Sequence, residues 1–146
     1  MARALSLSDG GRPSNLTAEK FRVDGFGDSP AFSALIAECE DSVAGYAVFY
    51  RGYDTDSASR GVYLADLYVR RDYRRRGVGR ALIAGVAECC RKDGARWMFW
   101  SVLKRNRPAR KFYRRVSVEL KDVVVCAAFD KAFDRLAEMK TPKRPD

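Results

Sequence analysis

Hydrophobic positions between residues 30 and 70 fall into short runs separated by polar residues. The runs are rich in β-branched and aromatic residues and predict three strands, over 32–38, 43–50 and 62–69. Asp41-Ser42 predicts a tight hairpin turn between the first two strands. The polar stretch 52–60 predicts a loop before the third.

The hydrophobic spacing becomes helical from residue 77 onward. One stripe of a predicted helix over 77–92 consists of Val78, Leu82, Val86 and one of the cysteines at 89 and 90. Charged residues lie off this stripe, so the helix is amphipathic. Asp93-Gly94 ends it.

The pattern after residue 94 predicts a buried strand, a helix, two strands and a last helix, over 97–103, 107–115, 116–120, 123–129 and 130–139. Asn106 is a good N-cap for the first of these helices, and Pro108 is tolerated in its first turn. Near the N-terminus, Thr17 caps a short helix over 18–23, which Gly25 and Gly27 end. The order predicts an α/β (α+β) sheet with helices packed on it.

The composition fits one globular domain in a chain of 146 residues, 47% of which are hydrophobic. We expect a flexible N-terminal arm over 1–15, a single domain over 16–140 and a tail over 141–146. No apolar run approaches the roughly 20 residues that span a bilayer, and the first residues resemble no targeting segment. A cytoplasmic protein without a membrane partner is therefore expected.

The chain has no histidine and four cysteines without a CxxC pair. A zinc site is hard to assemble from these residues, so no metal is expected, and the cysteines are interpreted as buried reduced thiols. Ser-His-Asp and Cys-His nucleophilic machinery is excluded. Any chemistry must use Tyr, Asp, Glu, Lys, Cys, backbone amides or water.

The formal net charge of +9 favours an anionic partner, such as nucleic acid, an anionic surface or a phosphorylated cofactor. Six arginines lie within residues 70–80, around Gly77 and Gly79. A basic loop and two glycines that open a helix are suited to bind phosphate. The pattern is neither a nucleotide P-loop nor a dinucleotide fingerprint, and a tight turn over a solvated basic face is the alternative.

Two segments of the chain resemble the GNAT superfamily of acetyl-CoA-dependent N-acetyltransferases. Arg74, Gly77 and Gly79 match its [QR]-x-x-G-x-[GA] motif, which follows a strand that here reads Tyr63-Leu-Ala-Asp-Leu-Tyr-Val69. Asn106-Arg-Pro-Ala-Arg-Lys-Phe-Tyr113 is similar to the family's N-x-x-A-x-x-F-Y segment. The diamine (spermidine/spermine) and thialysine branch is the most similar. The resemblance implies a mixed, mostly antiparallel central sheet flanked by helices, with the N-terminal strand and first helix shortened or missing.

The same resemblance implies where acetyl-CoA, the co-substrate, is bound. The pantetheine arm would pair with the backbone of three residues, Leu67, Tyr68 and Val69. The pyrophosphate would be enclosed by the turn that follows, Arg74, Arg75, Arg76, Gly77, Val78, Gly79 and Arg80. The sulfur end would touch Asn106, Pro108 and Ala109.

The chemistry that the resemblance implies is direct attack by a primary amine of a small molecule or peptide. Tyr113 would be the general acid that protonates the departing thiolate, because a phenol with a pKa near 10 stays protonated at neutral pH. Backbone N–H groups near Val69 would stabilise the oxyanion. Asp66 is the candidate for steering the ammonium substrate or accepting its proton through water. A homodimer is expected from the family's C-terminal edge strands.

The chain departs from these relatives on the presumed substrate side. Ala65 stands where the branch has a glutamate, Lys104 and Arg105 replace an acidic residue and a tryptophan, and Asp56 replaces another tryptophan. These changes predict that polyamines are poor substrates and that the acceptor is an amine with a carboxylate or phosphate, or a peptide. Two alternatives remain: a degenerate member that binds coenzyme A or a partner without efficient catalysis, and a basic nucleic-acid-binding domain, which no known motif supports.

Overall fold

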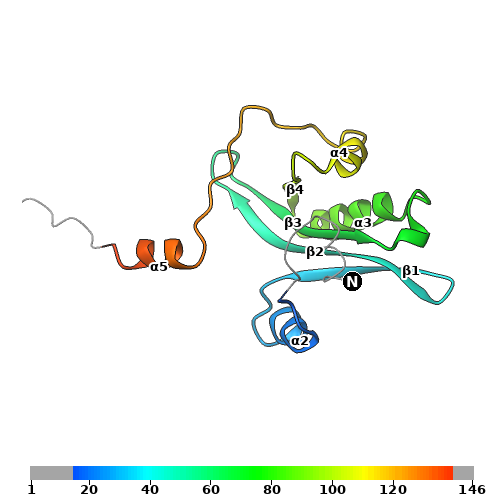
Figure 1. The fold of residues 1–146 in the computed structure, drawn as a ribbon, viewed down its shortest axis with the longest axis horizontal. Helices are drawn as coiled ribbons and strands as arrows, with labels where there is room; N and C mark the ends of the chain where they lie inside the picture. The colour runs from blue at the N-terminus through cyan, green and yellow to red at the C-terminus, as the bar shows by residue number, and fades with distance from the viewer. Residues whose placement is uncertain (1–14, 140–146) are drawn as a thin grey trace, which may run out of the picture. The chain divides into compact units, whose positions relative to one another are not determined.

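The computed structural model describes residues 15–139 and divides the chain into two compact units (Figure 1). The first unit ends at Val116 and contains the sheet, and the second begins at Ser117. The expected N-terminal arm, apart from residue 15, lies outside the described residues, as does the segment where a shortened first strand would be. Among residues 15–139, no helix is long and apolar enough to cross a membrane.

A four-stranded sheet forms the centre of the first unit, in the order β1-β2-β3-β4. The strands are β1 (Ser33–Cys39), β2 (Ser42–Asp54), β3 (Ser59–Val69) and β4 (Ala95–Phe99). The first three run antiparallel, and β4 is parallel to β3, which confirms the mixed, mostly antiparallel sheet. Most of the expected loop over 52–60 is strand instead, because Gly52, Tyr53 and Asp54 pair with Gly61, Arg60 and Ser59.

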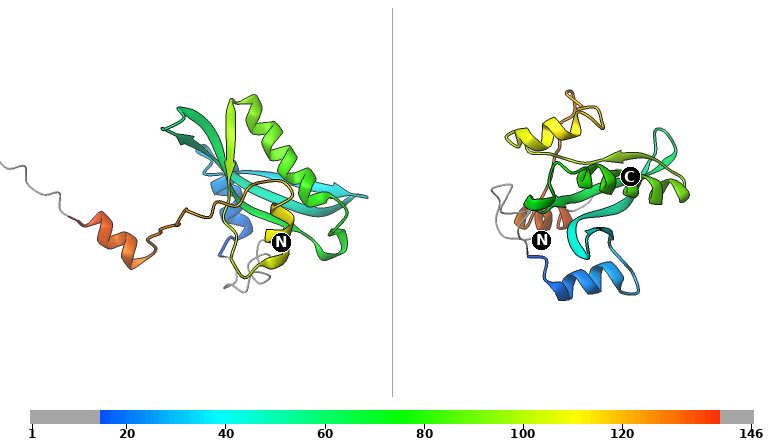
Figure 2. Two further views of the ribbon diagram at one scale, coloured as in Figure 1. Left: turned by 90° about the horizontal axis from the view of Figure 1, so that it is seen from above. Right: turned by 90° about the vertical axis from the view of Figure 1, so that its right-hand side faces the viewer.

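Helix α3 (Val78–Lys92) covers one face of this sheet (Figure 2). Its buried stripe is Val78, Leu82, Val86 and Cys90, which resolves the choice between the two cysteines. The stripe packs on buried strand residues, Ala44, Ala47, Phe49, Val62 and Leu64. The expectation of four buried thiols is wrong, because Cys89 and Cys126 are exposed and Cys39 is half-buried.

A β-bulge at Ala65 changes which residues of β3 face the core. Val48 pairs with Asp66 and Phe49 with Leu64, so Ala65 is the extra residue. Before the bulge, Val62 and Leu64 face α3; after it, Leu67 and Val69 do. Asp66 therefore lies on the opposite face of the sheet.

The turns and caps of the first unit fix where its elements end. Glu40 and Asp41 have φ angles of 50° and 60°, so the hairpin turn lies one residue before the expected Asp41-Ser42. Helix α2 (Ala18–Phe26) passes through Gly25 and is longer than expected. It begins as predicted, because Thr17 Oγ1 accepts a hydrogen bond from the Lys20 N–H at 3.1 Å.

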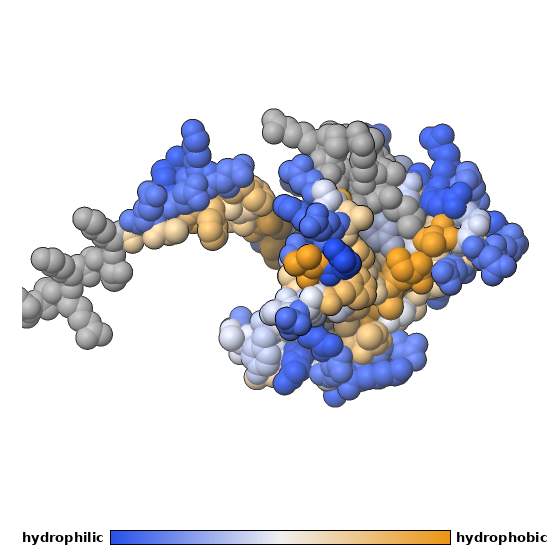
Figure 3. Space-filling view, turned by 90° about the horizontal axis from the view of Figure 1, so that it is seen from below, coloured by the Kyte–Doolittle hydropathy of each residue, from blue (hydrophilic) through white to orange (hydrophobic). Residues whose placement is uncertain are grey.

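The second unit contains helix α5 (Lys131–Ala137). The prediction of strands over 116–120 and 123–129 is wrong, since residues 117–129 form no strand. Val118 and Val124 are each 84% exposed. A high β-propensity is insufficient without a neighbouring strand, because propensity reflects packing on a sheet. Figure 3 shows polar residues gathered on one side of the α5 region and apolar residues on the other.

Candidate active site

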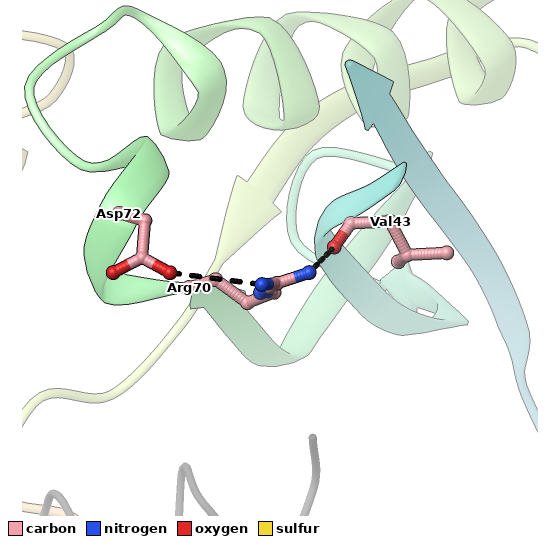
Figure 4. Close-up of polar contacts among 3 residues, drawn as sticks. All are labelled: Val43, Arg70 and Asp72. Carbon is pink, nitrogen blue, oxygen red and sulfur yellow. Dashed lines mark hydrogen bonds and ion pairs between the residues drawn. The ribbon is translucent and has the colours of Figure 1, made fainter. Parts of the chain in front are cut away.

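The six arginines predicted to form a basic turn lie between the end of β3 and the first turn of α3, around a 3₁₀ helix, η1 (Arg71–Tyr73). Arg70 anchors the start of this turn: its Nη1 donates to the Val43 carbonyl at 3.3 Å, and its Nη2 lies 3.6 Å from Asp72 (Figure 4). Asp72 is the only carboxylate of residues 15–139 that forms an ion pair with an arginine of this turn. The turn therefore keeps a strong positive charge for an anion.

The glycines of the turn leave space at the start of α3. Gly77 has a φ of 86°, which favours glycine, and a Cβ there would meet no atom within 4 Å. Gly77 has no side chain to cap the helix, and no side chain of residues 15–139 is found in its place, so the first N–H groups of α3 can bind an anion. Gly79 is different, because a Cβ there would lie 3.5 Å from Phe112 Cζ and 3.6 Å from Val69 Cγ2. Its small size allows α4 to approach α3.

The arginines of the turn do not all point outward. Arg74 Nε donates to the Val69 carbonyl at 2.9 Å, and its guanidinium lies 5.9 Å from the Tyr68 ring. Arg74 therefore holds the end of β3. Arg76 lies over the Tyr73 ring at 5.5 Å, whereas Arg75 and Arg80 are exposed and contact no carboxylate in the described part of the chain.

The edge of β3 opens where β4 ends. The two strands pair from Arg60 through Tyr63, whereas β3 continues to Val69. The Arg70 N–H donates to the Ala44 carbonyl on the β2 side. Because N–H and C=O groups alternate in direction along a strand, those of Leu67 and Val69 point to the open edge. An extended ligand can add to this edge as another strand does.

Tyr113 is the last residue of α4 (Arg107–Tyr113). The preceding residue, Phe112, packs its ring near Gly79. The Tyr113 ring lies 5.2 Å from the ring of Trp100, which follows β4. Asn106 Oδ1 accepts a hydrogen bond from the Ala109 N–H at 3.2 Å, as predicted for an N-cap. The Asn106 side chain is thus engaged in the helix cap, and Pro108 lies in the first turn. The expected helix over 107–115 is two residues shorter.

Asp66 lies on the face of the sheet opposite α3, where it accepts a hydrogen bond from the Tyr46 hydroxyl at 3.2 Å. Tyr46 is only 5% exposed. Burial and, to a smaller extent, the charge and hydrogen bond of Asp66 raise the pKa of the Tyr46 phenol. Tyr46 therefore remains a proton donor to the carboxylate at any ordinary pH.

The predicted residues thus form four groups: a basic turn, an open strand edge at Leu67–Val69, the start and end of α4 with Asn106, Pro108, Ala109 and Tyr113, and Asp66 on the far face. Sequence reasoning missed Tyr46 and Trp100. Tyr46 sits inside a predicted strand, and its partner on the next strand depends on the bulge, which no local pattern signals. Trp100 was assigned to a strand, but β4 ends at Phe99.

The profile of the Acetyltransferase (GNAT) family matches residues 5–117. Thialysine N-epsilon-acetyltransferase from Bos taurus is 32% identical over 112 residues, which cover 71% of this chain and 65% of that protein. Tyramine N-feruloyltransferase 4/11 from Nicotiana tabacum is 33% identical over 106 residues, which cover 72% of this chain and 43% of that protein. The chain thus spans less than two thirds of these relatives. An integron cassette protein from V. cholerae has the same fold, with a TM-score of 0.77 and 18% sequence identity. The match covers 94% of this chain and 87% of that protein.

Proposed function

The chain belongs to the GNAT acetyltransferase family, and from this membership we propose that it transfers an acetyl group from acetyl-CoA to a primary amine. The open edge of β3 is the observation that carries the proposal. It leads directly to an uncapped helix N-terminus and a basic turn. An extended donor with a hydrogen-bonding arm and a pyrophosphate requires such an edge beside an anion site.

In this proposal, the pantetheine arm of acetyl-CoA pairs with the outward N–H and C=O groups of Leu67 and with the C=O of Val69, beside Tyr68, while the Val69 N–H faces the thioester. The pyrophosphate binds the N–H groups at Gly77, Val78 and Gly79. Three arginines add charge, Arg75, Arg76 and Arg80. Arg74 contributes indirectly by holding the Val69 carbonyl. The start of α4, with Asn106, Pro108 and Ala109, borders the sulfur end.

The proposed reaction is a direct acyl transfer. The amine lone pair attacks the thioester carbonyl carbon, and a backbone N–H at Val69 stabilises the developing oxyanion. The C–S bond then breaks, and the departing thiolate takes a proton from the Tyr113 hydroxyl. The proton that the amine loses passes to water or, through water, to Asp66. Tyr113 regains its proton from solvent. No covalent enzyme intermediate is needed, which is consistent with a chain without histidine.

The donor site is best tested at the exposed arginines of the turn that form no ion pair with a carboxylate of residues 15–139. We expect the double substitution Arg75→Ala and Arg76→Ala to raise the Kd for coenzyme A by about tenfold, because two charge-assisted contacts to phosphate are lost. Isothermal titration at low and high salt measures this effect, which salt should reduce. Arg91→Ala, an exposed arginine at the other end of α3, is the matched control. Equal Kd values for the two variants would contradict the assignment.

A homodimer is the quaternary structure that we propose. The support is the set of exposed apolar side chains in the second unit, Val118, Leu120, Val123, Val124 and Val125. Apolar runs of this kind are unusual on the surface of a monomer. A second copy of the chain would remove them from water.

We expect Val124→Asp to shift the protein from dimer to monomer, because it places a charge among these valines. Light scattering after size-exclusion chromatography measures the mass. Lys121→Asp places a carboxylate on the same segment without removing an apolar side chain and serves as the control. A monomeric wild-type protein would contradict the dimer.

Turnover is the test of the proposed activity. Coenzyme A release from acetyl-CoA is measured with thialysine, tyramine, spermidine, amino acids, aminoglycosides and N-terminal peptides, and acetyl-CoA binding is measured separately. Release with at least one amine supports the transferase. Binding without release on any amine supports a second function, coenzyme A binding without catalysis. Ala65 favours this second function, because the branch has a glutamate there.

A further inference from the structure

Asp66 shares the face of the sheet opposite α3 with several aromatic side chains. Residues that pair directly across two antiparallel strands share a face, so the register places Tyr46, Tyr68, Tyr50 and Tyr63 on the side of Asp66. Trp97 also lies on this side, because a Cβ at Gly52, the pairing partner of Gly61, would be 2.8 Å from its indole. Phe99 follows it two residues later on β4.

The aromatic rings form three contacting pairs. The ring centroids are 6.0 Å apart in Tyr46–Tyr68, 5.1 Å in Tyr50–Tyr63 and 5.2 Å in Trp97–Phe99. The Tyr50 and Tyr63 rings are stacked, and Tyr63 also shares a hydrogen bond of 3.0 Å with Ser101. Tyr50 is 43% exposed and Phe99 is 49% exposed. A ligand can therefore reach the part of this face that holds Tyr50 and Phe99, whereas the part around Tyr46 is buried and Asp66 between them is half-buried.

Asp66 lies between two of these pairs. Asp66 pairs with Val48. On β2, Val48 lies two residues from Tyr46 of the Tyr46–Tyr68 pair and two residues from Tyr50 of the Tyr50–Tyr63 pair. Two residues along a strand span about 7 Å. The Tyr46 hydroxyl holds the carboxylate in place. A cation at Asp66 is thus within one short alkyl chain of a stacked aromatic pair.

We propose that this face is the acceptor site and that it selects a primary amine carrying an aromatic ring. The ammonium group lies near Asp66, and the ring stacks on the Tyr50–Tyr63 pair. This inference rests on the proposed transferase activity and names its substrate class. A diamine would need a second carboxylate, but the next positions of the face beyond Asp66 are Tyr50, Tyr63 and Phe99.

The test compares phenethylamine with hexylamine and spermidine as acceptors in the coenzyme A release assay. We expect kcat/KM for phenethylamine to exceed that for hexylamine by about tenfold, the ratio that one aromatic contact supplies. Tyr50→Leu should bring the kcat/KM values for phenethylamine and hexylamine close to each other. Tyr53→Leu should leave their ratio unchanged, because Tyr53 is on the same strand but lines a cavity with Cys90 on the α3 side. Equal kcat/KM values for the first two amines, or a higher value for spermidine, would overturn the inference while the transferase stands.

Binding of phenethylamine provides a readout that does not need turnover. Saturation-transfer NMR in the presence of coenzyme A should show transfer to its ring protons, which Tyr50→Leu weakens and Tyr53→Leu does not. This result without acetylation of any amine would support the aromatic site and refute the transferase. No transfer to the ring, or equal transfer with Tyr50→Leu, refutes the site. Circular dichroism shows whether the variants remain folded, and Tyr63→Leu is the second variant if Tyr50→Leu unfolds.

Discussion

Replacement of Tyr113 by phenylalanine should lower kcat by about 100-fold, because it removes the proton donor that we propose for the departing thiolate. The ring contacts to Trp100 and Phe112 remain in this variant, so α4 should keep its position. The Kd for coenzyme A should change by less than about threefold. Stopped-flow and steady-state measurements of coenzyme A release, with an amine that the wild-type protein acetylates, provide kcat.

Tyr53→Phe is the matched control for this variant. It also removes a tyrosine hydroxyl, but Tyr53 lines a cavity with Cys90 and is not one of the proposed site residues. The control should retain the wild-type kcat. A Tyr113→Phe protein with the wild-type kcat at neutral pH would show that another group protonates the thiolate.

Replacement of Gly61 by alanine should lower the free energy of unfolding by about 3 kcal/mol, near the upper end for inserting one methyl group into a packed site. The added Cβ would overlap the indole of Trp97, which lies directly over Gly61. Trp97 cannot easily move aside, because its Nε1–H donates to the Ser59 carbonyl at 3.2 Å. Gly61 and Trp97 are partners in the pairing of β3 with β4, so the effect should reach both strands.

Urea denaturation followed by tryptophan fluorescence measures this change. Gly85→Ala, in the middle of α3, is the control: its Cβ would be 3.2 Å from the flexible end of Leu35, and alanine favours a helix by up to about 1 kcal/mol. We expect it to remain within about 1 kcal/mol of the wild type. If Gly61→Ala is equally stable, the indole does not occupy the position found in the structure.

The sequence predicted elements well where a local pattern decides the structure. The stripe of α3, the caps at Thr17 and Asn106, and the glycine turn depend on neighbouring residues and were found. The strands expected over 116–120 and 123–129 were wrong, because valines form a strand only when a neighbouring strand accepts their hydrogen bonds.

The candidate site shows the same division. The basic turn was recognisable from charge and glycine spacing, and the family motifs added Tyr113 and the edge of β3. The bond between Tyr46 and Asp66 could not be predicted, because it joins residues 20 apart through a register that includes a bulge. The aromatic surface around Asp66 also depends on that register. Both follow from pairing between strands, which the hydrophobic pattern of one strand does not encode.

The bulge at Ala65 decides which residues of β3 reach the far face of the sheet. If Ala65 paired with Val48 in a regular strand of the same length, Asp66 and Tyr68 would turn toward α3, and Leu67 and Val69, which now pack against the core, would be exposed. Deletion of Ala65 would not have this effect, because Leu64 would stay opposite Phe49 and Asp66 opposite Val48. In a comparison of homologous genes, loss of this one codon should therefore be tolerated, whereas insertion of a further codon in this strand should be rare.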